Sequence, residues 1–145
     1  MGWSAIRAKI KTKLDGLVTS GSLGSVYNGE QNPQNVEFAA YPAAVIIRTQ
    51  SEPDFFTNRE DIQTYIFTIN IYQQIIGDDW HTQEIALDDP IDAVIQAFLD
   101  DASLTGSVDG RIQPIANGGS VISWNGKMHR LETITLRCKK ITAMS

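Results

Sequence analysis

The chain has 145 residues, of which 42% are hydrophobic and 20% are charged. These values are typical of a single globular domain and exclude a disordered chain. The net charge of −5 argues against a general nucleic-acid-binding protein, because such a protein usually carries a basic domain.

The sequence also excludes a membrane-spanning helix and a disulfide framework. The longest apolar run is much shorter than the ~20 residues that cross a bilayer. The segment MGWSAIRAKIKTKLDGL has four basic residues where a signal peptide has an uninterrupted apolar stretch, so we expect a protein made in the cytoplasm. One cysteine, Cys138, is too few for an internal disulfide or a cysteine-based zinc site.

Charge is unevenly distributed along the chain. Residues 52–109 contain thirteen of the seventeen acidic residues and one basic residue, a net −12, while the other eleven basic and four acidic residues give +7. Two interpretations stay open at this point. Either the charges belong to two solvated faces, or they make complementary head-to-tail contacts between copies of the protein or with its neighbours.

Residues 3–17 are predicted to form a helix. Ile6, Ile10, Leu14 and Leu17 recur at spacings of four, four and three, which places them on one helical face. The lysines of this segment lie mostly on the other face, as expected for a helix that packs on a core.

Two strands are expected in the next part of the chain. Residues 26–27 form a short one, and AAVIIR, residues 43–48, forms a strand that is buried on both faces. Residues 49–61 are then expected to be irregular, with a turn at Pro53 and Asp54.

The segment TYIFTINIYQQI, residues 64–75, gives the strongest strand prediction. Its side chains alternate with period two, and β-branched and aromatic residues dominate. Extended to residues 61–74, the strand would be roughly 45 Å long at 3.2–3.4 Å per residue. A small domain does not need so long a strand. We therefore expect it to project beyond its own sheet and to offer an edge to a neighbour.

A second helix is predicted to begin with Asp89 as N-cap and Pro90 as its first residue. Apolar residues then follow at i, i+3, i+4, i+7 and i+8. They are Ile91, Val94, Ile95, Phe98 and Leu99. Residues 77–81 are expected to form a loop, and residues 82–88 fit either an earlier helical turn or an extended approach.

Three more strands are predicted towards the C-terminus. Residues 111–115 and 120–124 form two short strands, and residues 127–141 form the returning one. Asn125 and Gly126 are typical of a two-residue hairpin, because a type I′ turn needs a positive φ at both positions. The whole order of elements predicts an α+β fold in a single domain: a mostly antiparallel four- to five-stranded sheet with two helices packed on one face.

No arrangement of residues points to catalysis, to a metal or to a cofactor, so we expect a protein that is not an enzyme. His81, His129 and Cys138 lack a known metal-ligand spacing. They are interpreted as an exposed loop residue, a strand residue and a buried structural thiol. No G-x-S-x-G or Walker motif occurs, and the adjacent Asp88 and Asp89 are explained as charges at a helix N-terminus.

Exposed aromatic residues are the remaining candidates for a functional site. Phe55, Phe56 and Trp80 lie in predicted loops among acidic residues, with Arg59 as the one base of that stretch. Loop aromatics either fold back onto their own core or act as hot spots of a protein interface. Both interpretations stay open, and these four residues are the candidate interface residues.

Taken together, the pattern resembles the tail terminator (tail completion) proteins of tailed bacteriophages and phage-like particles. Five segments carry the resemblance, in matching order and length over nearly the whole chain. They are the helix IRAKIKTKLDGL, the strand AAVIIR, the long strand TYIFTINIYQQI, the helix DPIDAVIQAFLDD and the strand HRLETITLRCKK. No short diagnostic motif is among them, and related neck and tail proteins of similar size share much of this pattern.

The resemblance implies an α+β domain that forms a hexameric ring in the neck region of the virion tail. Such a ring caps the last ring of the tail tube, ends tube elongation and presents the surface that joins the head. Its partners would be other copies of the chain, the tail tube protein and a head-closure or neck protein. Genome DNA would pass through without specific binding, which an acidic lumen would suit. No cofactor and no membrane are implied.

Two other functions stay open. One is a different neck or tail component, such as a head-closure or tube protein. The other, from a different class, is a cytoplasmic ligand-binding or enzyme-accessory domain. The latter would need a concave apolar pocket with convergent polar groups, which the sequence does not show.

Overall fold

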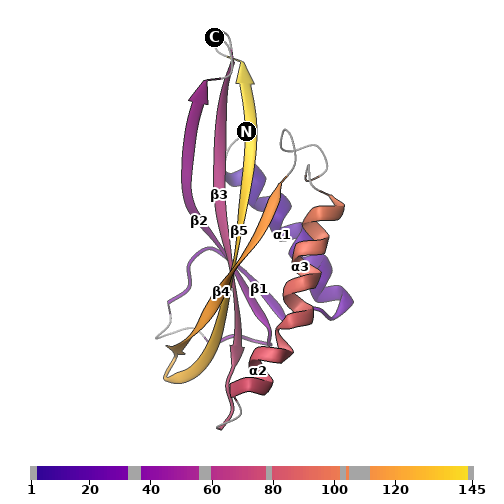
Figure 1. The fold of residues 1–145 in the computed structure, drawn as a ribbon, viewed down its shortest axis with the longest axis vertical. Coiled ribbons are helices and arrows are strands. Elements are labelled where there is room, and N and C mark those ends of the chain that lie inside the picture. The colour runs from indigo at the N-terminus through magenta and orange to yellow at the C-terminus, as the bar shows by residue number, and fades with distance from the viewer. Residues whose placement is uncertain are drawn as a thin grey trace.

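The computed structural model describes residues 3–32, 37–55, 60–77, 80–101, 104 and 112–143. These residues form one sheet with helices α1 (Trp3–Ser20) and α3 (Asp88–Asp100) packed on the same face (Figure 1). A further short helix, α2 (Trp80–Ala86), precedes α3. The predicted α+β class is therefore confirmed.

The sheet has five strands in the order β1-β2-β3-β5-β4. They are β1 (Ser25–Asn28), β2 (Ala43–Phe55), β3 (Glu60–Gln74), β4 (Gln113–Trp124) and β5 (Lys127–Ala143). All neighbouring strands are antiparallel except β1 and β2, which pair in parallel. This confirms the mostly antiparallel sheet expected from the sequence.

Helix α1 forms as predicted because its apolar residues recur every three or four positions. Ile6, Ile10 and Leu14 are fully buried against the sheet. The helix continues to Ser20, beyond the predicted end. It stops where Gly21 adopts a φ of +91°, a conformation that glycine accepts without steric cost.

Helix α3 begins two residues earlier than predicted, and packing rather than capping sets its start. Asp88 is its first residue, and Leu87 occupies the cap position without a side-chain hydrogen bond. Because Leu87 is fully buried, its apolar contacts fix this end of the helix. Asp89, the expected N-cap, instead lies within the first turn, where a negative charge is still favourable.

The segment before α3 resolves the alternative that the sequence left open. Residues 80–86 form the separate helix α2, so the expected loop is wrong for Trp80 and His81, which lie on that helix. None of the residues of α2 is buried. The helix therefore covers no core and presents its side chains to solvent.

The long strand is confirmed as β3, but the edge that it was expected to offer is not there. β3 pairs with β2 from Tyr72 to Asp61 and with β5 from Gln74 to Glu60. It is therefore the central strand of the sheet, bonded on both sides along its length. Beyond Ile46 and Arg137, where pairing with β1 and β4 ends, the described residues leave the outer edges of β2 and β5 without a partner.

The turn expected at Pro53 and Asp54 is also wrong. Both residues lie in β2, opposite Gln63 and Ile62 of β3. Among the described residues, β2 has no partner on its other side beyond Ile46. A proline fits such an edge strand, because its missing N–H can face the unpaired side.

β4 is one strand where two short ones were expected. A register shift between Ala116 and Gly119 inserts a bulge that keeps both halves paired with β5. The predicted hairpin to β5 is confirmed. Asn125 and Gly126 have φ angles of +52° and +74°, as a type I′ turn requires.

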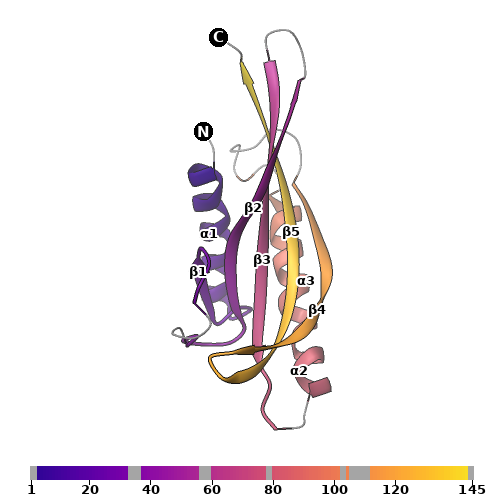
Figure 2. The same cartoon turned by 90° about the vertical axis from the view of Figure 1, so that its left-hand side faces the viewer.

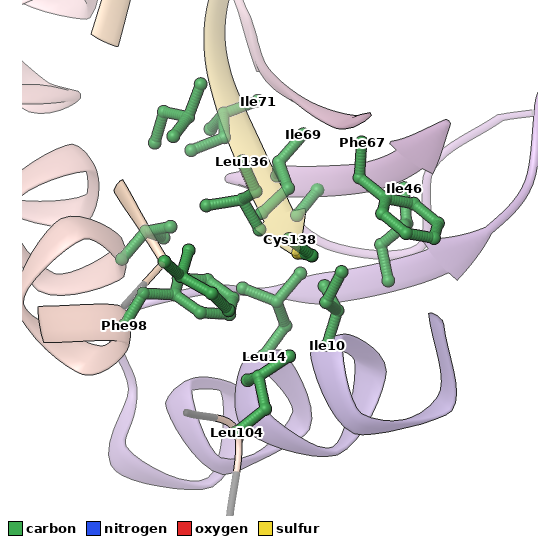
Figure 3. Close-up of a cluster of buried hydrophobic side chains, with 14 of the residues drawn as sticks. Ile10, Leu14, Ile46, Phe67, Ile69, Ile71, Phe98, Leu104, Leu136 and Cys138 are labelled. Carbon is green, nitrogen blue, oxygen red and sulfur yellow. The ribbon is translucent and has the colours of Figure 1, made fainter. Parts of the chain in front are cut away.

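Apolar clusters cover both faces of the sheet. In the larger cluster, Ile10 and Leu14 of α1 and Phe98 of α3 meet Phe67 and Cys138 of the strands (Figure 3). The smaller cluster lies on the opposite face and consists of Phe38, Ala43, Val45, Tyr72 and Trp124. Since β2 contributes to both clusters, the predicted burial of AAVIIR on two faces is confirmed.

Three strands continue beyond β1 and β4 as a narrow arm. β1 pairs with β2 only as far as Ile46, and β4 pairs with β5 only as far as Arg137. β2, β3 and β5 alone continue to the end opposite α2, as a twisted ribbon (Figure 1 and Figure 2). We call residues 49–55, 60–66 and 138–143 of these strands the arm, and the rest of the molecule the body.

Candidate interface surfaces

The described residues contain no group of three or more His, Cys, Asp or Glu side chains that could hold a metal ion. Cys138 is fully buried, and burial raises the pKa of its thiol to about 12. A thiol that is protonated at neutral pH is a poor nucleophile. Cys138 therefore has the buried, structural position predicted from the sequence.

His129 is buried in β5 and forms two hydrogen bonds. Its Nδ1 lies 2.9 Å from the carbonyl oxygen of Lys127, and its Nε2 lies 2.8 Å from the hydroxyl of Tyr41. A carbonyl oxygen only accepts, so Nδ1 donates to it and Nε2 accepts from Tyr41. Burial is the main cause that lowers the pKa of His129. The pair fastens the segment before β2 to β5, which is a structural role.

The candidate interface residues fall at opposite ends of the molecule. Phe55 is the last residue of β2 at the tip of the arm, where its backbone pairs with Asp61. Its side chain, and all of Phe56 and Arg59, lie outside the described residues. Trp80 is the first residue of α2 and is 48% exposed. This exposure argues against a core anchor at Trp80, and its role in an interface stays a prediction.

Two other exposed apolar residues near Trp80 in the chain were missed from the sequence. Ile76 follows β3 and is 72% exposed, and Ile85 lies on α2 and is 64% exposed. A single isoleucine next to a strand or in a helix normally indicates a core position, so the sequence carries no signal for this surface. Together with Trp80 they make the α2 end of the body unusually apolar.

Two hollows stand out on the described surface, and both are open to solvent. One, of about 450 Å³, lies on the sheet face opposite the helices and includes Asn70, Tyr72 and Trp124 in its lining. The other, of about 240 Å³, lies beside α1, where Lys13 and Asp101 form an ion pair at 3.0 Å. A small-molecule site normally encloses most of its ligand, which neither open hollow does.

The two main helices carry opposite charge. α1 has four basic residues and one acidic residue, whereas α2 and α3 together have five acidic residues and no basic one. These five are all exposed: Glu84, Asp88, Asp89, Asp92 and Asp100. On their shared face of the sheet, α1 lies towards β1 and α3 towards β4, and the two helices also contact each other (Figure 2). The uneven charge of the sequence thus becomes a basic side and an acidic side.

The arm has two free edges. Among the described residues, nothing pairs with the outer edge of β2 over residues 47–55 or with that of β5 over residues 138–143. At about 3.3 Å per residue these edges are roughly 30 Å and 20 Å long. Such a row of unpaired N–H and C=O groups is a template for another strand.

No helix of the described residues is long and apolar enough to cross a membrane. No model of a known protein family matches the sequence, and no curated protein matches it. What the protein does must therefore be inferred from its own surfaces.

Proposed function

We propose that the chain is a structural protein of a phage or phage-like particle, as the resemblance of its sequence implies. In this proposal it forms a ring, expected to be hexameric, that caps the tail tube, ends tube elongation and provides the surface for joining the head. The ring lies in the neck region of the virion tail. It has no enzymatic activity and requires no cofactor.

The unpaired strand edges of the arm are the observation that best supports this proposal. A protein that works as a monomer covers or blunts its sheet edges, because unpaired edges recruit other strands. This chain extends three strands beyond β1 and β4 with both outer edges unpaired among the described residues. Two free edges give each copy two places for a neighbour, and a subunit with two different contacts forms a ring when the rotation closes.

The taper of the molecule suits a closed ring. At 4.7–4.9 Å per strand, the three-stranded arm is about 14 Å wide, whereas the five-stranded body is about 24 Å wide. Subunits of a ring have less room near the axis than at the rim. With the arms inward, the narrow parts would lie around the lumen and the helices would lie outside.

The charges of the arm and the body fit the same assembly. The arm strands carry four acidic residues against two lysines, which disfavours tight contact with the phosphate backbone of passing DNA. Opposite charge at the two sides of the body favours a head-to-tail arrangement over a two-fold dimer, in which like sides would meet.

The first test is the mass of the purified protein by light scattering across a range of concentrations, with negative-stain images of the same samples. A ring of six 16.0 kDa copies would give about 96 kDa. The proposal would be refuted if the protein stayed at 16.0 kDa at all concentrations and also failed to form rings on purified tail tubes.

Removal of the gene from the phage then distinguishes a terminator from another neck protein. Loss of a terminator leaves overlong or headless tails. Finished tails beside leaking heads would instead identify a head-closure protein.

The exposed Trp80 gives a residue-level test at the α2 end. Trp80→Ala should lower the free energy of unfolding by only about 1 kcal/mol, because the side chain is half exposed and belongs to neither apolar cluster. The same change should weaken attachment to tubes or heads, as loss of an aromatic hot spot does. Leu99→Ala, at another exposed apolar residue, is the matched control. Normal tail joining by the Trp80, Phe55 and Phe56 alanine variants would refute their assignment to an interface.

A further inference from the structure

The larger of the two hollows, of about 450 Å³, lies between the segment that follows β1 and the sheet face opposite the helices. Glu30 and Gln31 line it from that segment, and Asn70 and Tyr72 line it from β3. None of the described residues in its lining is basic. The hollow is therefore a concave surface on which the one formal charge is negative.

Glu30 supplies that charge, and it is not neutralised within the protein. The residue is exposed, and none of the described residues forms a hydrogen bond or an ion pair with it. Its charge also acts across the hollow. Burial is the main cause that raises the pKa of the Tyr72 hydroxyl, and the Glu30 carboxylate raises it further. A carboxylate without a cation of its own can bind one that another molecule presents.

The polar groups around this carboxylate are oriented as acceptors. Gln31 donates from Nε2 to the carbonyl oxygen of Gly29 at 2.9 Å, which leaves Oε1 as the free end of that amide. Asn70 donates from Nδ2 to the Tyr72 hydroxyl at 3.4 Å and accepts from Thr133 at 3.3 Å, so it is satisfied and orients the hydroxyl. The hollow thus presents acceptors, which match a ligand that carries several donors.

The rest of the hollow is apolar. Val45 and Ile47 of β2 and Trp124 at the end of β4 line it, and the Phe38 ring stacks on Trp124 with 4.7 Å between the ring centroids. A long basic side chain places its methylene groups on apolar surface and its charged end among polar groups. Arginine also carries five N–H donors on a planar guanidinium group. The lining therefore matches an arginine side chain.

We propose that this hollow binds an exposed arginine of another protein. The guanidinium group lies on the Glu30 carboxylate and the Gln31 Oε1, and the methylene groups lie on Val45 and Ile47. The open side of the hollow, which a small ligand would leave in solvent, is covered by the surface of the partner around its arginine. This contact goes beyond the proposed ring and does not depend on it.

A different protein fits the hollow better than a second copy does. The described arginines of this chain all have partners within the chain. They are Arg7, Arg48, Arg130 and Arg137. The net charge of −5 also makes two copies repel each other, whereas it attracts a neighbour with a basic surface.

Titration with N-acetyl-arginine amide, followed by NMR, tests the site directly. The Gln31 amide and the Trp124 indole should show saturable shifts, with a Kd of roughly 1 mM for a probe of this size. The Trp3 indole packs on the opposite face of the sheet and should not shift. N-acetyl-citrulline amide is the matched probe, because it has nearly the same shape without the charge. It should bind roughly three- to tenfold more weakly.

Glu30→Gln should weaken binding of the arginine probe roughly three- to tenfold and leave binding of the citrulline probe unchanged. Glu37→Gln is the matched control. It removes the same charge from another exposed carboxylate, one that pairs with Lys127 at 2.8 Å and is not among the residues that line the hollow. This variant should bind both probes as the unmodified protein does.

The other outcomes overturn the proposal. No saturable shift of Gln31 or Trp124 at ten times the expected Kd would mean that the hollow does not bind arginine. Equal weakening by Glu30→Gln and Glu37→Gln would attribute the effect to net charge alone. If Glu30→Gln changed the mass of the assembled protein and not the binding of the probe, the carboxylate would belong to a contact between copies. Because the probe is measured on the purified chain, its failure would leave the proposed ring untouched.

Discussion

An added methyl group at Gly24 should strongly destabilise the protein, because it would clash with backbone atoms. A Cβ atom built on Gly24 would lie 2.6 Å from the carbonyl oxygen of Tyr41, 2.7 Å from its nitrogen and 2.8 Å from the carbonyl carbon of Ala40. All three are backbone atoms, so no side chain can rotate away. Gly24→Ala therefore has to push β1 and the segment 40–42 apart by about half an ångström or more.

The expected loss of stability follows from the hydrogen bonds that this movement would weaken. The Gly24 N–H donates to the carbonyl oxygen of Pro42 at 2.8 Å, and the Ser25 hydroxyl donates to that of Ala40 at 2.7 Å. Each bond contributes about 0.5–1.5 kcal/mol net, and overpacking costs about 1–3 kcal/mol. We expect the free energy of unfolding to fall by about 2–4 kcal/mol, which lowers Tm by roughly 6–14 °C in a domain of this size.

Urea unfolding followed by tryptophan fluorescence and circular dichroism would measure this loss. Gly16→Ala is the matched control: the glycine lies in α1, and its added Cβ would meet nothing within 4 Å. That variant should gain about 0.5–1 kcal/mol, because glycine is a poor helix residue. If Gly24→Ala unfolded within 0.5 kcal/mol of the unmodified protein, the close approach of β1 to Tyr41 would be wrong.

Three further predictions concern buried groups. Phe98→Ala should lower the free energy of unfolding by about 3–5 kcal/mol in urea titrations, since the ring is fully buried between α3 and the sheet. The folded state lowers the pKa of His129, so the stabilising effect of the neutral ring is complete above the unfolded pKa of about 6.5 and is lost as the pH falls below it. Unfolding at pH 8 to 5.5 should show this slope, and His129→Gln should flatten it. Cys138 should be unreactive to a thiol reagent in the native protein and react fully in denaturant; rapid native labelling would contradict its burial.

The sequence predicted best those elements whose pattern is set by packing on a core. α1, β3 and β5 follow a clear period because one face of each contacts the larger apolar cluster. The hairpin at Asn125 and Gly126 was equally predictable, since a two-residue turn makes a local demand on φ. In these helices, strands and turns, the local conformational preference of the residues agrees with the conformation that the whole fold requires.

The errors share a physical cause, which is that the deciding contact lies far away in the chain. Pro53 and Asp54 have turn chemistry, yet pairing with β3 holds them in a strand. The glycines of β4 indicated a break, whereas pairing with β5 holds one bulged strand together. Leu87 replaced Asp89 at the start of α3 through burial alone.

The candidate interface was only partly predictable for the same reason. Trp80 could be named from its polar surroundings, and its exposure agrees with that choice. The edges of the arm could not be named, because they depend on which strands lie outermost in the sheet. The sequences of residues 49–55 and 138–143 contain no information on strand order.

The position of β5 has a consequence for how the protein is made. β5 is the last of the described strands to be synthesised, yet it lies between β3 and β4. Until residues 127–143 have left the ribosome, β3 has only β2 as a partner and β4 has no partner among the described strands. A nascent chain that ends before β5 exposes the inner edge of β3 and leaves Phe67 and Ile69 without Leu136 and Cys138. Such long-range pairing makes folding slow and the unfinished chain prone to aggregation. The sheet therefore closes only after β5 has emerged, and binding by a chaperone would be most useful over the interval before that.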